Sequence, residues 1–194
     1  GSHEVVSQGN FHAEILGIVA DAMSLSLFEL SSISERRIDQ MLDPNRRAIQ
    51  PFLAENPGLE SGLMIVQYVA GASLGELRGH ANPRTAFSTT TSAGQEDHVS
   101  MGATASWNLL EAIQRCSEVI ACEAFVAHRA IQIMDKESST CVQALIRCMN
   151  NVVLPGLHDR STSEEIQSIA DEFVSSKWLS IIQSMIETPL RKSI

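Results

Sequence analysis

The side chains best suited to chemistry gather in one short polar segment, residues 91–102. It contains an amide and two acids in a row, Gln95, Glu96 and Asp97, followed by His98. A carboxylate that is shut away from water and faces an ammonium group or an imidazole ring can hold that charge, or take up a proton as a general base. An acid at this place can also stabilise the positive end of a following helix, and the pattern alone favours that simpler interpretation.

The cysteines do not form a metal-binding pattern. None of them forms a C-x-x-C pair, and all lie in segments with helical spacing: Cys116, Cys122, Cys141 and Cys148. Zinc sites usually show such pairs, whereas small buried thiols are common in proteins of reducing compartments. The sequence therefore predicts buried thiols, no metal ion and a cytoplasmic location.

Helical periodicity accounts for the elements that must position the polar segment. Before it, we expect a first helix entered through residues 9–14, bent near residues 31–34 and ended at Pro44, and a second helix from Leu59 to Gly79. After it, residues 99–134 form a proline-free helical pattern, which would be about 50 Å long at about 1.5 Å per residue. The apolar residues expected to face a core are Ile15, Val19, Ala22, Met23, Leu27 and Leu30 in the first helix, Leu63, Val66, Ala70, Leu74 and Leu77 in the second, and Leu109, Ile113, Cys116 and Ile120 in the third.

Two further helical patterns complete the chain. Residues 140–151 predict a short helix, and Ser161-x-x-Glu164 predicts a capping box before a last helix that runs through residues 166–185. No convincing strand, repeat or low-complexity tract is present. The sequence therefore predicts an all-α bundle of long helices, and a rod such as 99–134 belongs to a long bundle or an oligomer core.

Composition limits the function classes. The 194 residues carry a net charge of −9, with 14 basic and 23 acidic side chains, and the basic ones do not cluster as in a nucleic-acid-binding protein. No apolar run reaches the roughly 18 residues of a membrane span. Residues 1–3 (Gly-Ser-His) resemble a cloning scar, and no start methionine precedes Glu4, so residues 4–194 are expected to be one helical region of a larger protein.

Four segments, in the same order and with plausible gaps, resemble the histidine ammonia-lyase family, which includes phenylalanine and tyrosine ammonia-lyases and related aminomutases. They are Gly9-Asn10-Phe11-His12, Ser34–Ile38 with Asp43-Pro44, Asn56–Ile65, and Gln95–Met101. The resemblance implies an almost entirely helical homotetramer whose active sites draw residues from more than one subunit. The enzymes of this family remove ammonia from an aromatic amino acid, or move the amine between the α and β carbons.

The resemblance also implies what the chain lacks. The family's electrophile, 4-methylidene-imidazole-5-one (methylidene-imidazolone), forms from an internal Ala-Ser-Gly triplet, which is not present in this sequence. The family's tyrosine base belongs to an earlier portion, and Tyr68, the single tyrosine here, does not match it. The chain therefore resembles the C-terminal part of such a lyase, and we expect it to need an N-terminal lyase segment or other subunits and to be inactive alone.

Four residues match family site positions. Glu96 and Gln95 are expected to be catalytic, with Glu96 facing the substrate and Gln95 beside the cofactor. Phe11 would border the substrate, and Met64 falls where histidine lyases carry Met and phenylalanine lyases carry Lys, which favours histidine as substrate. Core packing explains Phe11 and Met64 equally well. The alternatives to a lyase are a 2,3-aminomutase of the same family and a non-catalytic helical assembly module.

Overall fold

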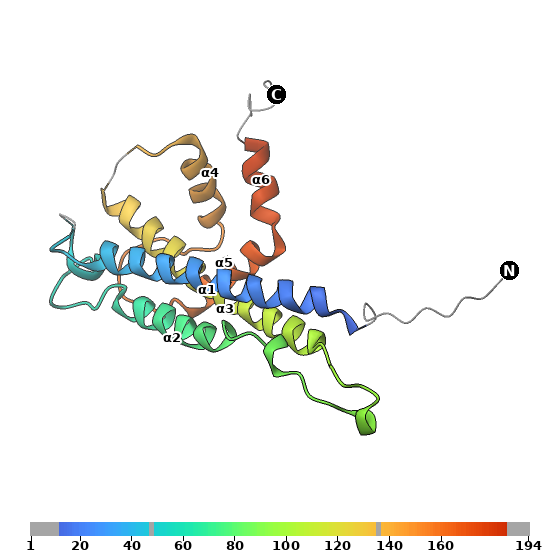
Figure 1. The fold of residues 1–194 in the computed structure, drawn as a ribbon. Helices are drawn as coiled ribbons and strands as arrows, with labels where there is room; N and C mark the ends of the chain where they lie inside the picture. The colour runs from blue at the N-terminus through green and yellow to red at the C-terminus, as the bar shows by residue number, and fades with distance from the viewer. Residues whose placement is uncertain (1–11, 47–48, 135–136, 186–194) are drawn as a thin grey trace.

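The computed structural model describes residues 12–46, 49–134 and 137–185 (Figure 1). Within these ranges the chain is helical and contains no strand, only isolated bridges, so the predicted all-α fold is confirmed. Residues 1–3 and Phe11 lie outside the described ranges. The elements are α1 (Glu14–Leu42), η2 (Pro51–Leu53), α2 (Met64–His80), η3 (Thr85–Phe87), η4 (Ser92–Gly94), α3 (Gly102–Met134), α4 (Thr140–Met149), α5 (Ser163–Ser175) and α6 (Lys177–Met185).

The central element is α3, a helix of 33 residues that begins three residues later than predicted. Helix α1 runs parallel to it: Gly17 meets Gly102 at one end, and the Ser34 hydroxyl donates a 2.6 Å hydrogen bond to Glu123 further along. An added Cβ on Gly17 would lie 3.1 Å from the Gly102 Cα, so the two helices touch through backbone at this point.

Helix α2 runs antiparallel to α3 on another side. The Ser73 hydroxyl donates to Glu118 at 2.8 Å, and the ring of His80, at the other end of α2, contacts the Asn108 side-chain oxygen at 2.9 Å. The predicted core face of α2 is largely confirmed: Leu63, just before the helix, and Val66, Ala70 and Leu77 are buried, while Leu74 is half-buried and packs against the core. The predicted α3 stripe is only partly confirmed, since Cys116 is buried while Leu109, Ile113 and Ile120 are half-buried.

The predicted core face of α1 is wrong. Most of its apolar stripe points outward, with Ile15 70% and Val19 49% exposed, although Leu27 is half-buried against a small core cluster. The helix continues without interruption through residues 31–34. Through residue 34 the buried face is built from small and polar residues, whereas the apolar Ile38 and Leu42 are buried at the C-terminal end of the helix. The small and polar residues are Gly17, Ala20, Asp21, Ser24, Ser31 and Ser34. Small side chains allow α1 to approach α3 closely. This close packing, more than burial of the apolar stripe, decides which face of α1 turns inward.

Helix α1 also qualifies the prediction about membranes. By length and composition it could cross a membrane, because one 18-residue window has a mean hydropathy of 1.4. In the fold, 28% of that window is buried. Core helices of soluble proteins can pass the same test of length and hydropathy. The acid at Asp21 and the serines at 24, 31 and 34 make one face of α1 a polar contact surface toward the rest of the bundle.

Two predictions for the C-terminal part are wrong. The last helix is divided at Ser176, whose φ of 58° ends α5 and lets α6 turn back, so that Trp178 packs edge to face on Phe173 at 5.6 Å. Ser161 does not cap α5, which begins at Ser163 without a side-chain cap bond. The acid that reaches back is Glu165, which accepts hydrogen bonds from the Leu154 backbone and from Arg160.

The cysteines follow the prediction except for one. All four are free, and Cys116, Cys122 and Cys148 are buried whereas Cys141 is exposed. Burial raises the pKa of the Cys122 thiol to about 12, with the nearby Glu118 charge adding to the shift. This thiol is therefore protonated and unreactive at neutral pH.

Candidate functional site

The polar segment forms a closed turn. The backbone of Thr91 donates to the Glu96 carbonyl at 2.9 Å and accepts from the Glu96 N–H at 3.3 Å, while the Thr91 hydroxyl donates to the Glu96 carboxylate at 2.7 Å. Between them, Ser92, Ala93 and Gly94 all have left-handed backbone angles, with φ of 53°, 53° and 87°. The three bonds therefore fix both the backbone and the side chain of Glu96 relative to the loop.

The start of this loop is fixed to α1 by Asp21. Its carboxylate accepts from the backbone N–H groups of Arg84 and Thr85, each at 2.9 Å, and from the Thr85 hydroxyl at 2.7 Å. Burial alone raises the pKa of Asp21, but these hydrogen bonds and the Arg84 charge outweigh it and hold that pKa below its ordinary value of 3.8. Asp21 is therefore an ionised anchor, and the sequence analysis missed it.

The end of the loop is fixed to the entrance of α1 and α3. The His98 ring nitrogen lies 3.1 Å from the Glu14 carboxylate, and the Ser100 hydroxyl donates to the His12 carbonyl. Gly102, the first residue of α3, has no room for a side chain, because an added Cβ would lie 3.1 Å from the Ala13 carbonyl oxygen. The His98 ring thus links the end of the loop to the first turn of α1.

Gln95 and Glu96 are exposed. They belong to the loop between α2 and α3, which projects away from the helices (Figure 1). These two predicted catalytic residues thus lie together on one hydrogen-bonded turn, and the residues that the structure describes do not enclose them. Met64 lies elsewhere. It is half-buried at the first turn of α2, beside a hollow of about 430 Å³ that Phe52, Gln67 and Tyr68 also line.

Glu96 and Met64 cannot share one ligand within a single copy of the described chain. Met64 begins α2, and the loop of Glu96 follows the other end of the same helix. A helix of 17 residues is about 25 Å long at about 1.5 Å per residue, which exceeds the length of an amino acid. The third predicted contact, Phe11, is outside the described residues.

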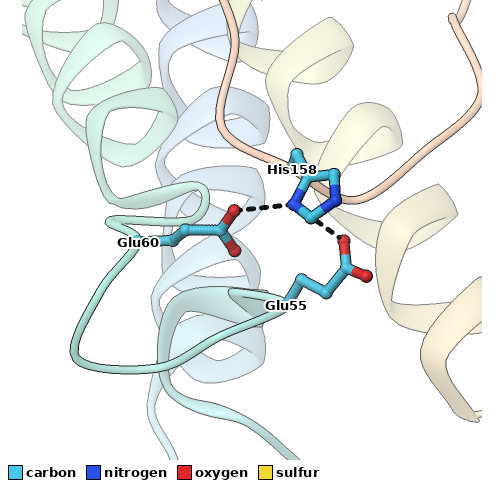
Figure 2. A group of neighbouring side chains, drawn as sticks. All are labelled: Glu55, Glu60 and His158. Carbon is cyan, nitrogen blue, oxygen red and sulfur yellow. Dashed lines mark hydrogen bonds and ion pairs between the residues drawn. The ribbon is translucent and has the colours of Figure 1, made fainter.

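A second group of chemically capable side chains lies on another part of the molecule (Figure 2). His158 Nδ1 is 2.8 Å from a Glu60 oxygen and 3.3 Å from a Glu55 oxygen. The neighbouring Asp159 accepts from the backbone N–H groups of Ser61 and Gly62, at 2.7 and 2.9 Å. Sequence reasoning missed this group, since its members are up to about a hundred residues apart, although Glu60 lies inside one of the family-like segments.

Comparisons with known proteins cover all of the family-like segments. The aromatic amino acid lyase family matches residues 1–151. The probable histidine ammonia-lyase of Thermoplasma acidophilum is 39% identical over 178 residues, which cover 89% of this chain and 36% of that protein.

Solved structures show the same likeness. The histidine ammonia-lyase from Trypanosoma cruzi aligns with a TM-score of 0.88 at 30% identity, covering 96% of this chain and 37% of the other. The tyrosine aminomutase from Streptomyces globisporus aligns with a TM-score of 0.91 at 25% identity, covering 98% and 37%. This chain thus spans little more than a third of the length of these relatives. Because the family match includes well over half of the 194 residues, the chain belongs to the aromatic amino acid lyase family.

Proposed function

We propose that this chain is the C-terminal segment of a histidine ammonia-lyase-like enzyme that eliminates ammonia from an aromatic amino acid. The observation that carries the proposal is the Gln95–Glu96 turn. Hydrogen bonds hold the loop at both ends, and it presents a carboxylate and an amide at the surface, where other segments can complete a site. Relatives that match over most of this chain are named histidine ammonia-lyases.

Glu96 and Gln95 would act directly on the bound amino acid. Once enclosed by other segments, the Glu96 carboxylate can hold the substrate's ammonium or imidazole charge, or accept a proton as a general base. The Gln95 amide can donate to and accept from polar groups beside it. Pre-orientation by the Thr91 hydroxyl would lower the entropy cost of placing the carboxylate.

The family's electrophile does not fit the residues of this chain. The two Ala-Ser pairs are followed by Leu74 and Trp107 instead of glycine. Both serines lie within helices, where Ser73 donates to Glu118 and Ser106 donates to the Gly102 carbonyl. A methylidene-imidazolone would therefore have to be supplied by residues outside these 194, and we assign no step on it to this chain.

Assembly with other copies or segments is part of the proposal. The separation of Glu96 from Met64 along α2 favours sites shared between chains, as in a homotetramer. Large apolar side chains along the outer face of α1 are 45–70% exposed, and a surface of this kind marks a protein contact. They are Ile15, Leu16, Ile18, Val19, Met23, Leu25, Leu30 and Ile33.

A 2,3-aminomutase is the second candidate, favoured by the likeness to tyrosine aminomutase. The test uses the full-length enzyme with histidine, tyrosine and phenylalanine, measuring released ammonia and, separately, the β-amino acid. We expect ammonia release from histidine, whereas accumulation of a β-amino acid would establish the mutase. A full-length protein that forms a tetramer but converts none of the three would be a non-catalytic assembly module.

The role of Glu96 is tested by Glu96→Ala in the same enzyme. We expect the turnover number to fall about a hundredfold or more, the usual contribution of a positioned acid or base, while the oligomer size stays unchanged. Asp97→Ala is the matched control, since Asp97 is the next acid in the same exposed loop. Equal turnover of Glu96→Ala and wild type would remove Glu96 from the site.

A further inference from the structure

Three side chains with metal-ligand chemistry converge away from the Gln95–Glu96 turn (Figure 2). Glu55 and Glu60 come from the segment between η2 and α2, and His158 comes from the segment between α4 and α5. One ligand atom of each lies within 4.8 Å of the other two. We propose that Glu55, Glu60 and His158 form a binding site for a divalent transition-metal ion of the zinc class.

The distances between donor atoms suit such an ion. Zinc binds nitrogen and carboxylate oxygen at about 2.0–2.2 Å, so donors around one ion are about 3.4 Å apart in tetrahedral and about 3.0 Å apart in octahedral geometry. The His158 nitrogen lies 2.8 Å from Glu60 and 3.3 Å from Glu55, close to these values. The remaining carboxylate pair, at up to 4.8 Å, can close by rotation of the exposed Glu55 side chain.

The donor set selects the metal. An imidazole nitrogen favours zinc and its neighbours over magnesium and calcium, which prefer oxygen-only shells. Two carboxylates balance the charge of a divalent ion. His158 is exposed, so a water molecule can take a fourth position.

Hydrogen bonds around the three ligands hold them in place. The second Glu60 oxygen accepts from the Asn56 N–H at 3.0 Å, which leaves the first oxygen directed at His158. Asp159, adjacent to His158, holds the backbone of Ser61 and Gly62. Outer contacts of this kind orient metal ligands. A bound ion would therefore cross-link the loop before α2 to the segment before α5.

The same geometry also suits a protonated His158 paired with the two acids, so the experiment must separate a proton from a metal. Full-length protein, stripped with chelator, is titrated with Zn²⁺ by calorimetry near neutral pH, and a crystal soaked in Zn²⁺ is measured at the zinc edge. We expect an anomalous peak between the three side chains. We also expect affinity at this site to fall at least about tenfold in Glu60→Gln and in His158→Gln.

Two controls separate this site from other zinc ligands. His98→Gln removes a histidine that, among the residues described by the structure, contacts the carboxylate of Glu14 alone, and Cys141→Ser removes the exposed thiol. Both should leave the site's affinity unchanged. Glu55→Gln, on an exposed side chain, provides a variant that is expected to fold normally. Unchanged zinc binding in the Glu60→Gln/His158→Gln double variant, or no zinc peak at the cluster, would overturn the proposal.

Discussion

The Thr91 hydroxyl donates a 2.7 Å hydrogen bond to the carboxylate of Glu96, and the backbones of the same two residues exchange a further pair of bonds. The turn between them passes through three successive left-handed residues, Ser92, Ala93 and Gly94. A left-handed conformation costs a non-glycine residue roughly 1–2 kcal/mol. The loop therefore accepts local strain in a conformation that orients an exposed carboxylate.

Replacing Thr91 with Val should lower the turnover of the full-length enzyme by less than Glu96→Ala does. Valine keeps the shape of threonine and leaves the two backbone bonds in place, so only the orientation of the carboxylate is lost. The measurement is kcat for both single variants and the double variant. If Thr91 acts through Glu96, adding Thr91→Val to Glu96→Ala should cause no further loss. Thr91→Ser, which retains the hydroxyl, should restore most of the activity.

Replacing Asp21 with Asn should reduce the free energy of unfolding by about 2 kcal/mol at neutral pH, because Asp21 accepts three hydrogen bonds as a buried charge. The pKa of Asp21 is lowered in the fold, so its stabilisation is complete above the ordinary value of 3.8 and is lost as the pH falls through the lower folded value. Urea unfolding of both proteins over a pH series measures this. A difference that stays constant below pH 3.8 would contradict the ionised anchor.

Spacing predicted that α1, α2 and α3 exist, although α2 begins at Met64 instead of Leu59 and the last predicted helix is divided into α5 and α6. It did not always predict which face is buried. For α2 the stripe from Leu63 to Leu77 identified the core face, since α2 packs on α3 through apolar side chains. For α1 the same reasoning chose the outer face. Hydrophobic spacing identifies an apolar face, and it does not show whether the rest of the same chain packs on that face.

The candidate sites divide in the same way. The Gln95–Glu96 turn could be found because its residues are adjacent in sequence and resemble a family segment. Asp21 and the group of Glu55, Glu60 and His158 could not, because their partners come together only through tertiary packing. An acid among the small and apolar residues of α1 was the one available signal for Asp21.

Replacing Asp159 with Asn should loosen the loop that leads into α2. Each Asp159 oxygen accepts one backbone N–H, from Ser61 and from Gly62, whereas an asparagine offers a single acceptor oxygen. Losing one charge-assisted bond should speed amide hydrogen exchange in this loop roughly tenfold. Asp171→Asn is the control, because Asp171 accepts from the Gln167 side chain on its own helix. Unchanged exchange at Ser61 and Gly62 would show that Asp159 does not restrain them.

Two glycine-to-alanine changes should have opposite effects on stability. Gly17→Ala places a Cβ 2.8 Å from the Thr85 methyl group and 3.1 Å from the Gly102 Cα, so α1 and α3 must separate, at a cost of about 1–3 kcal/mol. Gly75→Ala meets nothing within 4 Å on the exposed side of α2, and it should stabilise the helix by roughly 0.5–1 kcal/mol.

Urea unfolding of both variants against wild type measures the two free energies of unfolding. In the assembled full-length enzyme the effect of Gly75→Ala can differ. If a partner chain packs on α2 at Gly75, the added methyl group would clash with it and would lower the free energy of unfolding instead of raising it. Stabilisation of the isolated chain together with destabilisation of the assembled enzyme would therefore locate a subunit contact on that face. Equal effects of the two substitutions in the isolated chain would contradict the close contact between Gly17 and Gly102.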